Sequence, residues 1–324
     1  MSKYYPTNAA MSVKFSVIIP LYNKRAEIAG TLRSALGQSC PAHEIVVVDD
    51  GSTDGSADVV RQVVREDESG VPVKLIAQIN AGECAARNRA MVEATGEWFA
   101  LLDADDQWET DYLATIASLI ERYPGCGAYC TAFNIVGKNG RCVPSDSPDR
   151  EGVVEDYFRE AMRHYILIPS ATTLSREAVA AVGGFPEGMK LGGDQFMWVK
   201  LVAGGWRVAF SPLRMCRYNI AASNRSAATY VAEKTPYSFR DYRLDGAYWR
   251  NEYLAKVEIN KALTVSAKGG DDYAREVERF YGYTRLSRRA WHKLWILNRL
   301  PRRWRTPLMR FYNGAAWLLA RKGV

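Results

Sequence analysis

The sequence predicts an α/β fold, with a mostly parallel sheet covered by helices on both faces and a helical C-terminal extension. Short β-branched runs alternate with segments of helical spacing four times within about one hundred residues. Acidic or polar residues follow directly where several of these runs end, as in open parallel sheets that bind ligands at one edge. From about residue 230 onward, the apolar spacing is helical and rich in aromatic residues and arginine.

Buried strands are expected at four apolar runs, over residues 15–19, 44–48, 73–76 and 98–102. Helices are expected over 24–36, from a cap at Ser52 or Asp54, over 83–94 and over 111–123. The rhythm then changes, because residues 129–136 and 141–143 flank a hairpin turn at 137–140. Two further helices are expected over 175–182 and 195–202.

The length and composition predict a globular protein of about two domains. The chain has 324 residues, of which 48% are hydrophobic and 24% charged. Its six cysteines form no CxxC pair, which disfavours a structural zinc site or a disulfide framework. With neither a signal peptide nor a membrane-spanning run, we expect a cytoplasmic protein, peripheral on the inner face of the cell membrane if it binds lipid.

Carboxylates follow two of the expected strands. Asp49 and Asp50 end the second strand, and Asp103, Asp105 and Asp106 follow the fourth. Three carboxylates this close together repel one another unless a cation is present, and an oxygen-only set suits Mg²⁺ or Mn²⁺. Ordinary structural roles remain open, because an aspartate can cap a helix and Asp-Gly-Ser is common turn chemistry.

No glycine-rich phosphate loop of the GxGxxG or GxxxxGK[ST] type follows the first strand. A dehydrogenase-like dinucleotide fold and a P-loop are therefore disfavoured. A metal ion on Asp105 is the natural alternative means of holding phosphates.

Four motifs in order resemble the family 2 inverting glycosyltransferases, whose fold is called GT-A. They are FSVIIPLYN at 15–23, VVVDDGSTD at 46–54, NAG at 80–82 with ARN at 86–88, and LLDADD at 101–106. The resemblance covers roughly residues 15–226. It implies a transferase domain over 15–228, with a nucleotide-binding half (15–110) and an acceptor-binding half (111–228), between an N-terminal extension (1–14) and a helical region (229–324).

The resemblance also implies roles for individual residues. Pro20 and Tyr22 would line the base pocket, Asp50 would accept a hydrogen bond from the uracil of a UDP-sugar, and Arg87 would lie near the nucleotide. Asp103 would contact the ribose or the sugar, and Asp105 would hold the divalent metal with Asp106 nearby.

Later motifs of the family match less closely. Asp194 corresponds to the proposed catalytic base, but Gly193 stands where the family often has a glutamate. Arg217 and Arg225 lie in segments that resemble the part of the family that closes over the diphosphate. A solvated surface loop is the alternative for both arginines.

The chemistry expected from this resemblance is a single displacement at the anomeric carbon. A hydroxyl acceptor needs a base at neutral pH, and the nucleoside diphosphate leaving group needs a cation. We expect transfer from a nucleotide-sugar to a glycan or lipid-linked acceptor in cell-surface polysaccharide synthesis. The alternatives are a sugar nucleotidyltransferase and a non-catalytic protein that binds membrane or nucleic acid.

The C-terminal segment 281–324 holds eleven Lys or Arg residues, four tryptophans and no Asp or Glu. Arginine mixed with tryptophan and leucine suits an interfacial helix on anionic lipid. Phosphate contacts and base stacking would also suit nucleic acid, although we do not expect that partner. The remaining alternative is that the aromatic residues pack on the catalytic domain.

Overall fold

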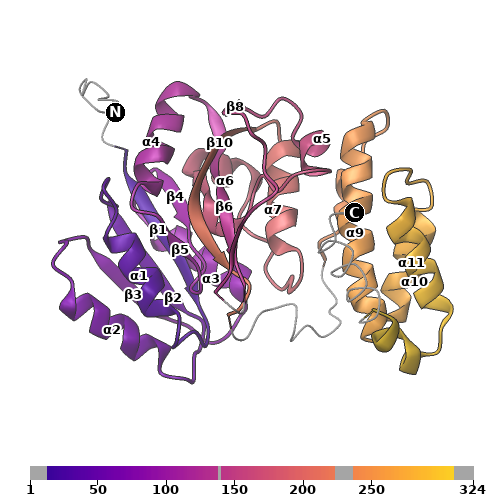
Figure 1. Ribbon diagram of the computed structural model, residues 1–324, viewed down its shortest axis with the longest axis horizontal. Coiled ribbons are helices and arrows are strands. Elements are labelled where there is room, and N and C mark those ends of the chain that lie inside the picture. The colour runs from indigo at the N-terminus through magenta and orange to yellow at the C-terminus, as the bar shows by residue number, and fades with distance from the viewer. Residues whose placement is uncertain (1–12, 138–139, 223–235, 310–324) are drawn as a thin grey trace.

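The computed structural model describes residues 13–137, 140–222 and 236–309. One large sheet runs through the molecule (Figure 1). Its strands are β1 (Phe15–Leu21), β2 (Glu44–Asp49), β3 (Val73–Ala77), β4 (Trp98–Leu101), β5 (Gln107–Trp108), β6 (Cys126–Val136), β7 (Cys142–Pro144), β8 (Gly152–Val153), β9 (Thr172–Ser175) and β10 (Arg207–Asn219).

Helices cover the sheet and extend beyond it. Those of the sheet domain are α1 (Ile28–Leu36), α2 (Ser56–Glu66), α3 (Glu83–Glu93), α4 (Tyr112–Arg122), α5 (Tyr157–Ala161), α6 (Arg176–Val182) and α7 (Gly193–Ala203), with the 3₁₀ turn η1 (Pro169–Ala171). The C-terminal part contains η2 (Phe239–Tyr242), α9 (Tyr248–Ala267), α10 (Asp271–Phe280) and α11 (Arg288–Arg299).

The strand order is β3-β2-β1-β4-β9-β6-β10-β5, with β7 beside β6 and β8 beside β10. Strands β3, β2, β1 and β4 are all parallel, as the alternating pattern predicts. In the second half β9 runs antiparallel to both β4 and β6, while β6 and β10 are parallel. The sheet is therefore parallel where the acidic motifs lie and mixed beyond them.

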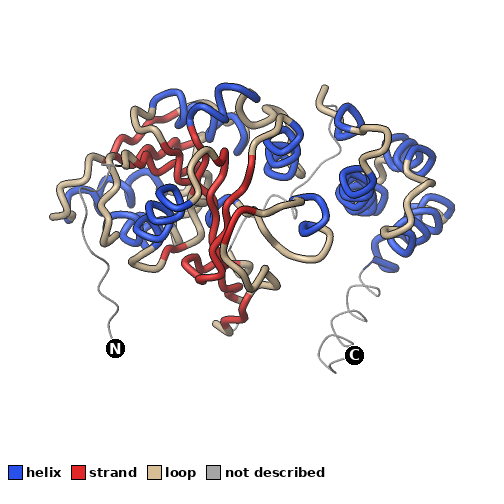
Figure 2. Tube along the Cα trace, turned by 90° about the horizontal axis from the view of Figure 1, so that it is seen from above, coloured by secondary structure: helices blue, strands red, loops and turns tan. Residues whose placement is uncertain are grey.

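Each face of the sheet has its own hydrophobic core, because successive strand residues point to opposite faces. In β1, for example, Val17 and Ile19 pack on one side with α1, α2 and α4, whereas Ile18 packs on the other. The second core joins α3, α5, α6 and α7 to the C-terminal helices. Helices thus lie on both faces of the sheet, which is clear in the view from above (Figure 2).

The C-terminal helices form a compact group in which α9 packs against both α10 and α11. Helix α9 contacts the sheet domain through α5, and η2 contacts α7. Helices α10 and α11 lie on the outer side of α9, away from the sheet (Figures 1 and 2). None of the helices within 13–137, 140–222 and 236–309 combines the length and apolar composition of a membrane span.

Most expected elements are present, with small shifts at their ends. The hairpin of β6 with β7 and the helices α6 and α7 are confirmed. The first helix begins at Ile28 rather than Lys24. The cause is tertiary: the backbone N–H of Lys24 donates to the hydroxyl of Ser56, so the chain makes a turn there before the helix starts.

Candidate active site

The carboxyl ends of β1, β2 and β4 meet at one edge of the sheet, because these strands are parallel neighbours. The loops after β1 and β2 are tied together at this edge. The amide of Asn23 donates to the hydroxyl of Ser52 at 2.9 Å, and its side-chain oxygen accepts from the amide of Thr53 at 2.8 Å. Two motifs that are distant in sequence therefore form one rigid rim.

Asp50 is 2% exposed and connects this rim to the start of α3. Its carboxylate accepts hydrogen bonds from Gln78 Nε2 at 2.7 Å and from the amides of Ala81 and Gly82, both at 2.8 Å. Gly82 has a φ of +93°, which favours glycine at this sharp entry into the helix. Three protein donors thus already use most of the lone pairs of Asp50.

Arg87 on α3 holds Asp103 in place. The guanidinium is 1% exposed, lies 2.5 Å from Asp103 Oδ1 and also pairs with Glu83. It stacks over the ring of Phe185, 5.2 Å from the ring centroid, and its Nε has no hydrogen-bond partner in the structure. Arg87 is therefore a buried cation whose charge is shared between two carboxylates at the sheet edge.

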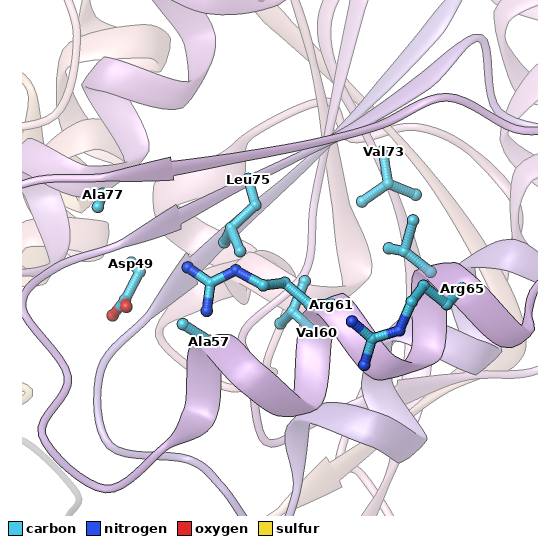
Figure 3. A pocket seen from close by; sticks show the side chains of 9 residues that line it. Asp49, Ala57, Val60, Arg61, Arg65, Val73, Leu75 and Ala77 are labelled. Carbon is cyan, nitrogen blue, oxygen red and sulfur yellow. The ribbon is translucent and has the colours of Figure 1, made fainter.

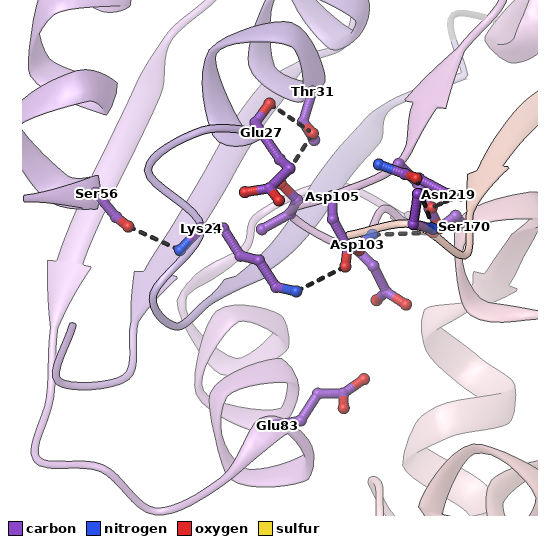
Figure 4. Close-up of polar contacts among 12 residues, drawn as sticks. Lys24, Glu27, Thr31, Ser56, Glu83, Asp103, Asp105, Ser170 and Asn219 are labelled. Carbon is purple, nitrogen blue, oxygen red and sulfur yellow. Dashed lines mark hydrogen bonds and ion pairs between the residues drawn. The ribbon is translucent and has the colours of Figure 1, made fainter. Parts of the chain in front are cut away.

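Asp105 pairs with a lysine that the sequence analysis did not assign to the site. Lys24 Nζ lies 2.8 Å from Asp105 Oδ2, and both side chains are largely buried (Figure 4). Lys24 follows directly after the first motif. One indication of this pair was present in the sequence: Lys24 is a basic residue just beyond the first strand, and a run of acids follows the fourth strand.

Asp106 is buried and contacts the second half of the sheet domain. It accepts hydrogen bonds from the hydroxyl of Ser170 at 2.5 Å and from the amide of Asn219 at 2.7 Å. Burial raises the pKa of this carboxyl, and the charges of Asp103 and Asp105 raise it further. Neither Asp105 nor Asp106 caps a helix, since α4 begins at Tyr112.

Asp194 lies in the first turn of α7, whose start packs against the start of α3. A Cβ at Gly193 would lie 2.4 Å from Cys84 Sγ, so only glycine allows this approach. Burial raises the pKa of Asp194, with a further rise from Glu83 and an opposing effect of Arg87. The charged groups that act on Asp194 are therefore Glu83 and Arg87, both on α3.

The other predicted residues lie at or near the same edge. Pro20 is buried within β1, whereas Tyr22, just beyond the strand, is 41% exposed. Arg217 is exposed on β10, so it belongs to a strand and not to a loop. It lies two residues before Asn219, on the same face of the strand. Arg225 lies outside the described residues.

A divalent metal would have to be held jointly by the protein and a phosphate ligand. The described residues contain no group of three His, Cys, Asp or Glu side chains that could hold a metal ion. Asp105 nevertheless offers a carboxylate at the sheet edge that already binds a positive charge, the ammonium of Lys24. One or two carboxylates completed by substrate phosphates are a usual coordination for Mg²⁺, so these residues fit such an ion.

A separate hollow of about 400 Å³ lies between α2 and the edge strand β3. Val60, Leu75 and Val73 form its apolar wall, with Arg61 and Arg65 along α2 and Asp49 at one end (Figure 3). The hollow is not lined by Asp50, Asp103, Asp105, Asp106 or Asp194.

Comparison with known sequences identifies the family. The profile described as "Glycosyl transferase family 2" matches residues 16–183. The putative teichuronic acid biosynthesis glycosyltransferase TuaG of Bacillus subtilis is 29% identical over 76% of this chain and 97% of its own length. The uncharacterized glycosyltransferase YibD of Escherichia coli is 34% identical, but the match spans 44% of this chain and 41% of YibD.

Solved structures show the same fold. TarS 1–349 of Staphylococcus aureus in complex with UDP-GlcNAc superimposes with a TM-score of 0.59 over 87% of this chain and 79% of that chain, at 22% identity. The mannosyltransferase PcManGT of Pyrobaculum calidifontis, in complex with GDP-Man and Mn²⁺, gives a TM-score of 0.50 over 96% of this chain and 79% of that chain, at 20% identity. Fold, ordered motifs and family profile agree, and the chain is a glycosyltransferase that belongs to glycosyl transferase family 2.

Proposed function

We propose that this enzyme transfers a sugar, with inversion, from a UDP-sugar to a hydroxyl group of a glycan or lipid-linked acceptor in cell-surface polysaccharide synthesis. The observation that carries the proposal is the gathering of acids around the start of α3. Asp50 accepts from the amide of Gly82, Asp103 pairs with Arg87, and the turn that carries Asp194 packs on Cys84. Asp105 lies on the same edge of the sheet. TuaG is named for teichuronic acid biosynthesis and AmsB of Erwinia amylovora for amylovoran biosynthesis, which supports this class of product. The UDP-GlcNAc complex of TarS supports a uridine nucleotide.

Asp194 is the proposed general base. Deprotonation of the acceptor hydroxyl requires a carboxylate whose proton affinity approaches that of a neutral-pH base, and burial shifts the pKa of Asp194 in that direction. The carboxylate belongs to the first turn of an eleven-residue helix that packs tightly on α3. This packing keeps the base at a constant position relative to Asp103.

The nucleotide is proposed to bind along the rim that joins the loops after β1 and β2. Tyr22 is exposed there and provides an aromatic surface for the base. Asp50 lies below this surface, with three hydrogen bonds to the residues that precede α3. The proposed uracil contact would use its remaining lone pair.

Asp103 and Asp105 are proposed to face the sugar and diphosphate. Bound Mg²⁺ or Mn²⁺ would supply positive charge to stabilise the departing diphosphate. Asp105 would hold the ion, with Asp106 next to it in the chain. Arg217 on β10 lies two residues before Asn219, whose amide donates to Asp106. We propose Arg217, together with Arg225, as a contact of the diphosphate.

Location at the inner membrane surface is also proposed, since a lipid-linked acceptor would be presented there. The C-terminal segment supplies the positive charge that an anionic bilayer attracts. A soluble glycan acceptor would not require this location.

A binding panel tests the nucleotide assignment. Isothermal calorimetry with UDP, GDP, dTDP and CMP, each with and without Mn²⁺, should show UDP as the preferred ligand and a gain in affinity with Mn²⁺. Asp105→Ala should remove the gain from Mn²⁺ and leave metal-free binding nearly unchanged.

Absence of binding to every nucleotide would refute the donor assignment. An equal response of Asp105→Ala and the wild type to Mn²⁺ would refute the metal role of Asp105.

A further inference from the structure

Helix α11 has one exposed face on which basic and apolar side chains alternate. The exposed residues are three or four positions apart, a spacing that places them on a single side of a helix. They are Arg288, Arg289, His292, Trp295, Ile296 and Arg299, here called the α11 face. The opposite side of α11 is buried through Leu294, Leu297 and Asn298.

The α11 face also exposes two adjacent apolar side chains. Trp295 is 41% and Ile296 37% exposed. Single exposed apolar residues are common on protein surfaces, but a tryptophan beside an isoleucine within a basic face indicates an interaction surface.

Among the described residues, two of the three arginines of the α11 face, Arg288 and Arg289, have no acidic partner. Arg299 pairs with Glu278 at 2.8 Å and stacks over Trp295, 4.1 Å from the ring centroid. Arg288 donates to the carbonyl of Gly282 and stacks over Trp291. In the described part of the chain, no acidic side chain forms an ion pair with Arg288 or Arg289, and none occurs within 281–324.

The position of α11 leaves this face accessible. Helix α9 lies between α11 and the sheet, so α11 borders the outer surface of the molecule (Figure 1). Packing on the catalytic domain, the alternative for these aromatic residues, therefore does not apply to Trp295.

We propose that the α11 face docks the protein on an anionic lipid bilayer. Tryptophan and isoleucine side chains would enter the region between headgroups and acyl chains, while the long arginine side chains would reach anionic headgroups beside them. The α11 face has a single exposed tryptophan, whereas single-stranded nucleic acid is bound by several aromatic side chains on which successive bases stack, and this favours lipid. The surface is separate from the transferase site, so lipid binding can be tested without any sugar transfer.

Co-sedimentation of the full chain with vesicles tests the proposal. The probes are phosphatidylcholine vesicles with and without phosphatidylserine. We expect binding only with phosphatidylserine, weakened by salt because the attraction is electrostatic. Arg288→Gln with Arg289→Gln should lower the partition coefficient about twenty-fivefold, at about fivefold for each arginine. Trp295→Ala with Ile296→Ala should lower it roughly tenfold through loss of apolar burial.

Two matched controls separate this face from general effects of charge or exposure. Arg61→Gln with Arg65→Gln removes the same charge from α2, and Ile79→Ala with Val92→Ala shortens two other exposed apolar residues. Both controls should bind vesicles like the wild type. The proposal is overturned if the wild type ignores phosphatidylserine, if the controls lose as much binding as the α11 variants, or if the α11 variants lose binding to single-stranded RNA only.

A measurement on the unaltered protein covers the case in which a variant misfolds. Hydrogen–deuterium exchange with and without anionic vesicles should show added protection over residues 288–299. Unchanged exchange there, under conditions where the protein sediments with vesicles, would assign the contact to another surface. Either failure leaves the transferase proposal intact, since nucleotide binding is measured without lipid.

Discussion

Lys24 and Asp105 form a 2.8 Å ion pair at the position proposed for the metal. A lysine ammonium and a divalent cation compete for the same carboxylate, because both are attracted to its negative charge. Lys24 therefore holds the carboxylate in place before the donor binds. We propose that the same ammonium contacts a diphosphate oxygen when the donor binds.

Lys24→Met should increase the affinity of the nucleotide-free protein for Mn²⁺ by roughly tenfold, since it removes one positive charge beside the proposed metal ligand. Isothermal calorimetry with Mn²⁺ alone measures this change. Lys14→Met, which removes an exposed lysine before β1, should leave the affinity unchanged. Equal Mn²⁺ affinity in Lys24→Met and wild type would show that Asp105 does not bind the ion.

Asp194→Asn should lower turnover by roughly a hundredfold to ten-thousandfold, the range typical of general-base catalysis, with little change in UDP affinity. Steady-state kinetics and calorimetry on the same preparation measure both quantities. Asp272→Asn, an exposed aspartate on α10, is the matched control and should keep wild-type turnover. A full rate in Asp194→Asn would remove this residue from the mechanism.

The raised pKa of Asp194 also predicts the pH dependence of turnover. A base acts only when deprotonated, so turnover is full above its pKa and is lost as the pH falls through it. Because burial raises that pKa, the acidic limb of the kcat profile should lie above the value near 4 of an ordinary aspartate. An acidic limb at or below that value would contradict Asp194 as the base.

At the scale of elements, the start of α3 organises the site. Its preceding residues donate to Asp50, its first turns carry Glu83 and Arg87, and Cys84 borders Gly193 of α7. A displacement of α3 would therefore move the nucleotide-binding rim and the proposed base together.

Helix α7 is supported from its other side by η2, which belongs to the C-terminal part. Phe239 is fully buried, stacks edge-on against Phe196 at 5.1 Å and lies next to Gly192 at the start of α7. The C-terminal region thus helps to position the helix that carries Asp194. This role is separate from the lipid binding proposed for its outer surface.

Phe239→Ala should destabilise the protein by about 3–5 kcal/mol, as expected for truncation of a buried phenylalanine. It should also lower turnover more than UDP affinity. The cavity that the truncation creates would lie beside the start of α7, which carries the proposed base. Chemical denaturation, steady-state kinetics and calorimetry measure the three quantities. Phe280→Ala, at a partly exposed phenylalanine of α10, should cost less stability and leave turnover unchanged. Equal effects of both variants would contradict this role of Phe239.

At the scale of the whole molecule, one hydrophobic core crosses from the sheet to the C-terminal helices. Phe196 and Met197 of α7 belong to the same cluster of buried residues as Leu254 of α9 and Leu294 of α11. Tyr253 of α9 also stacks against Tyr157 of α5, with ring centroids 5.9 Å apart. The two parts should therefore lose their structure together.

Calorimetric unfolding should show a single transition that includes the C-terminal helices, because separating them would expose this shared core. Far-ultraviolet and near-ultraviolet circular dichroism should give the same midpoint. An early transition that removes helical signal without loss of UDP binding would show that the C-terminal part unfolds independently.

Local patterns in the sequence predicted the parallel half of the sheet, its helices and the strand ends at which the acidic side chains lie. Period-two and helical spacings depend on nearby residues alone, so the four parallel strands and their helices could be predicted. The acids at strand ends followed from the same patterns, because parallel strands end at one edge. The ordered motifs then identified the family.

Only the tertiary structure decided which groups these acids contact. Asp105 is paired with Lys24, 81 residues away, and Asp106 with Asn219, 113 residues away. The antiparallel insertion of β9, the late start of α1 and the support of α7 by Phe239 likewise depend on distant partners. No local spacing encodes such contacts, since they arise when separate elements pack and their polar groups must find partners in the buried interface.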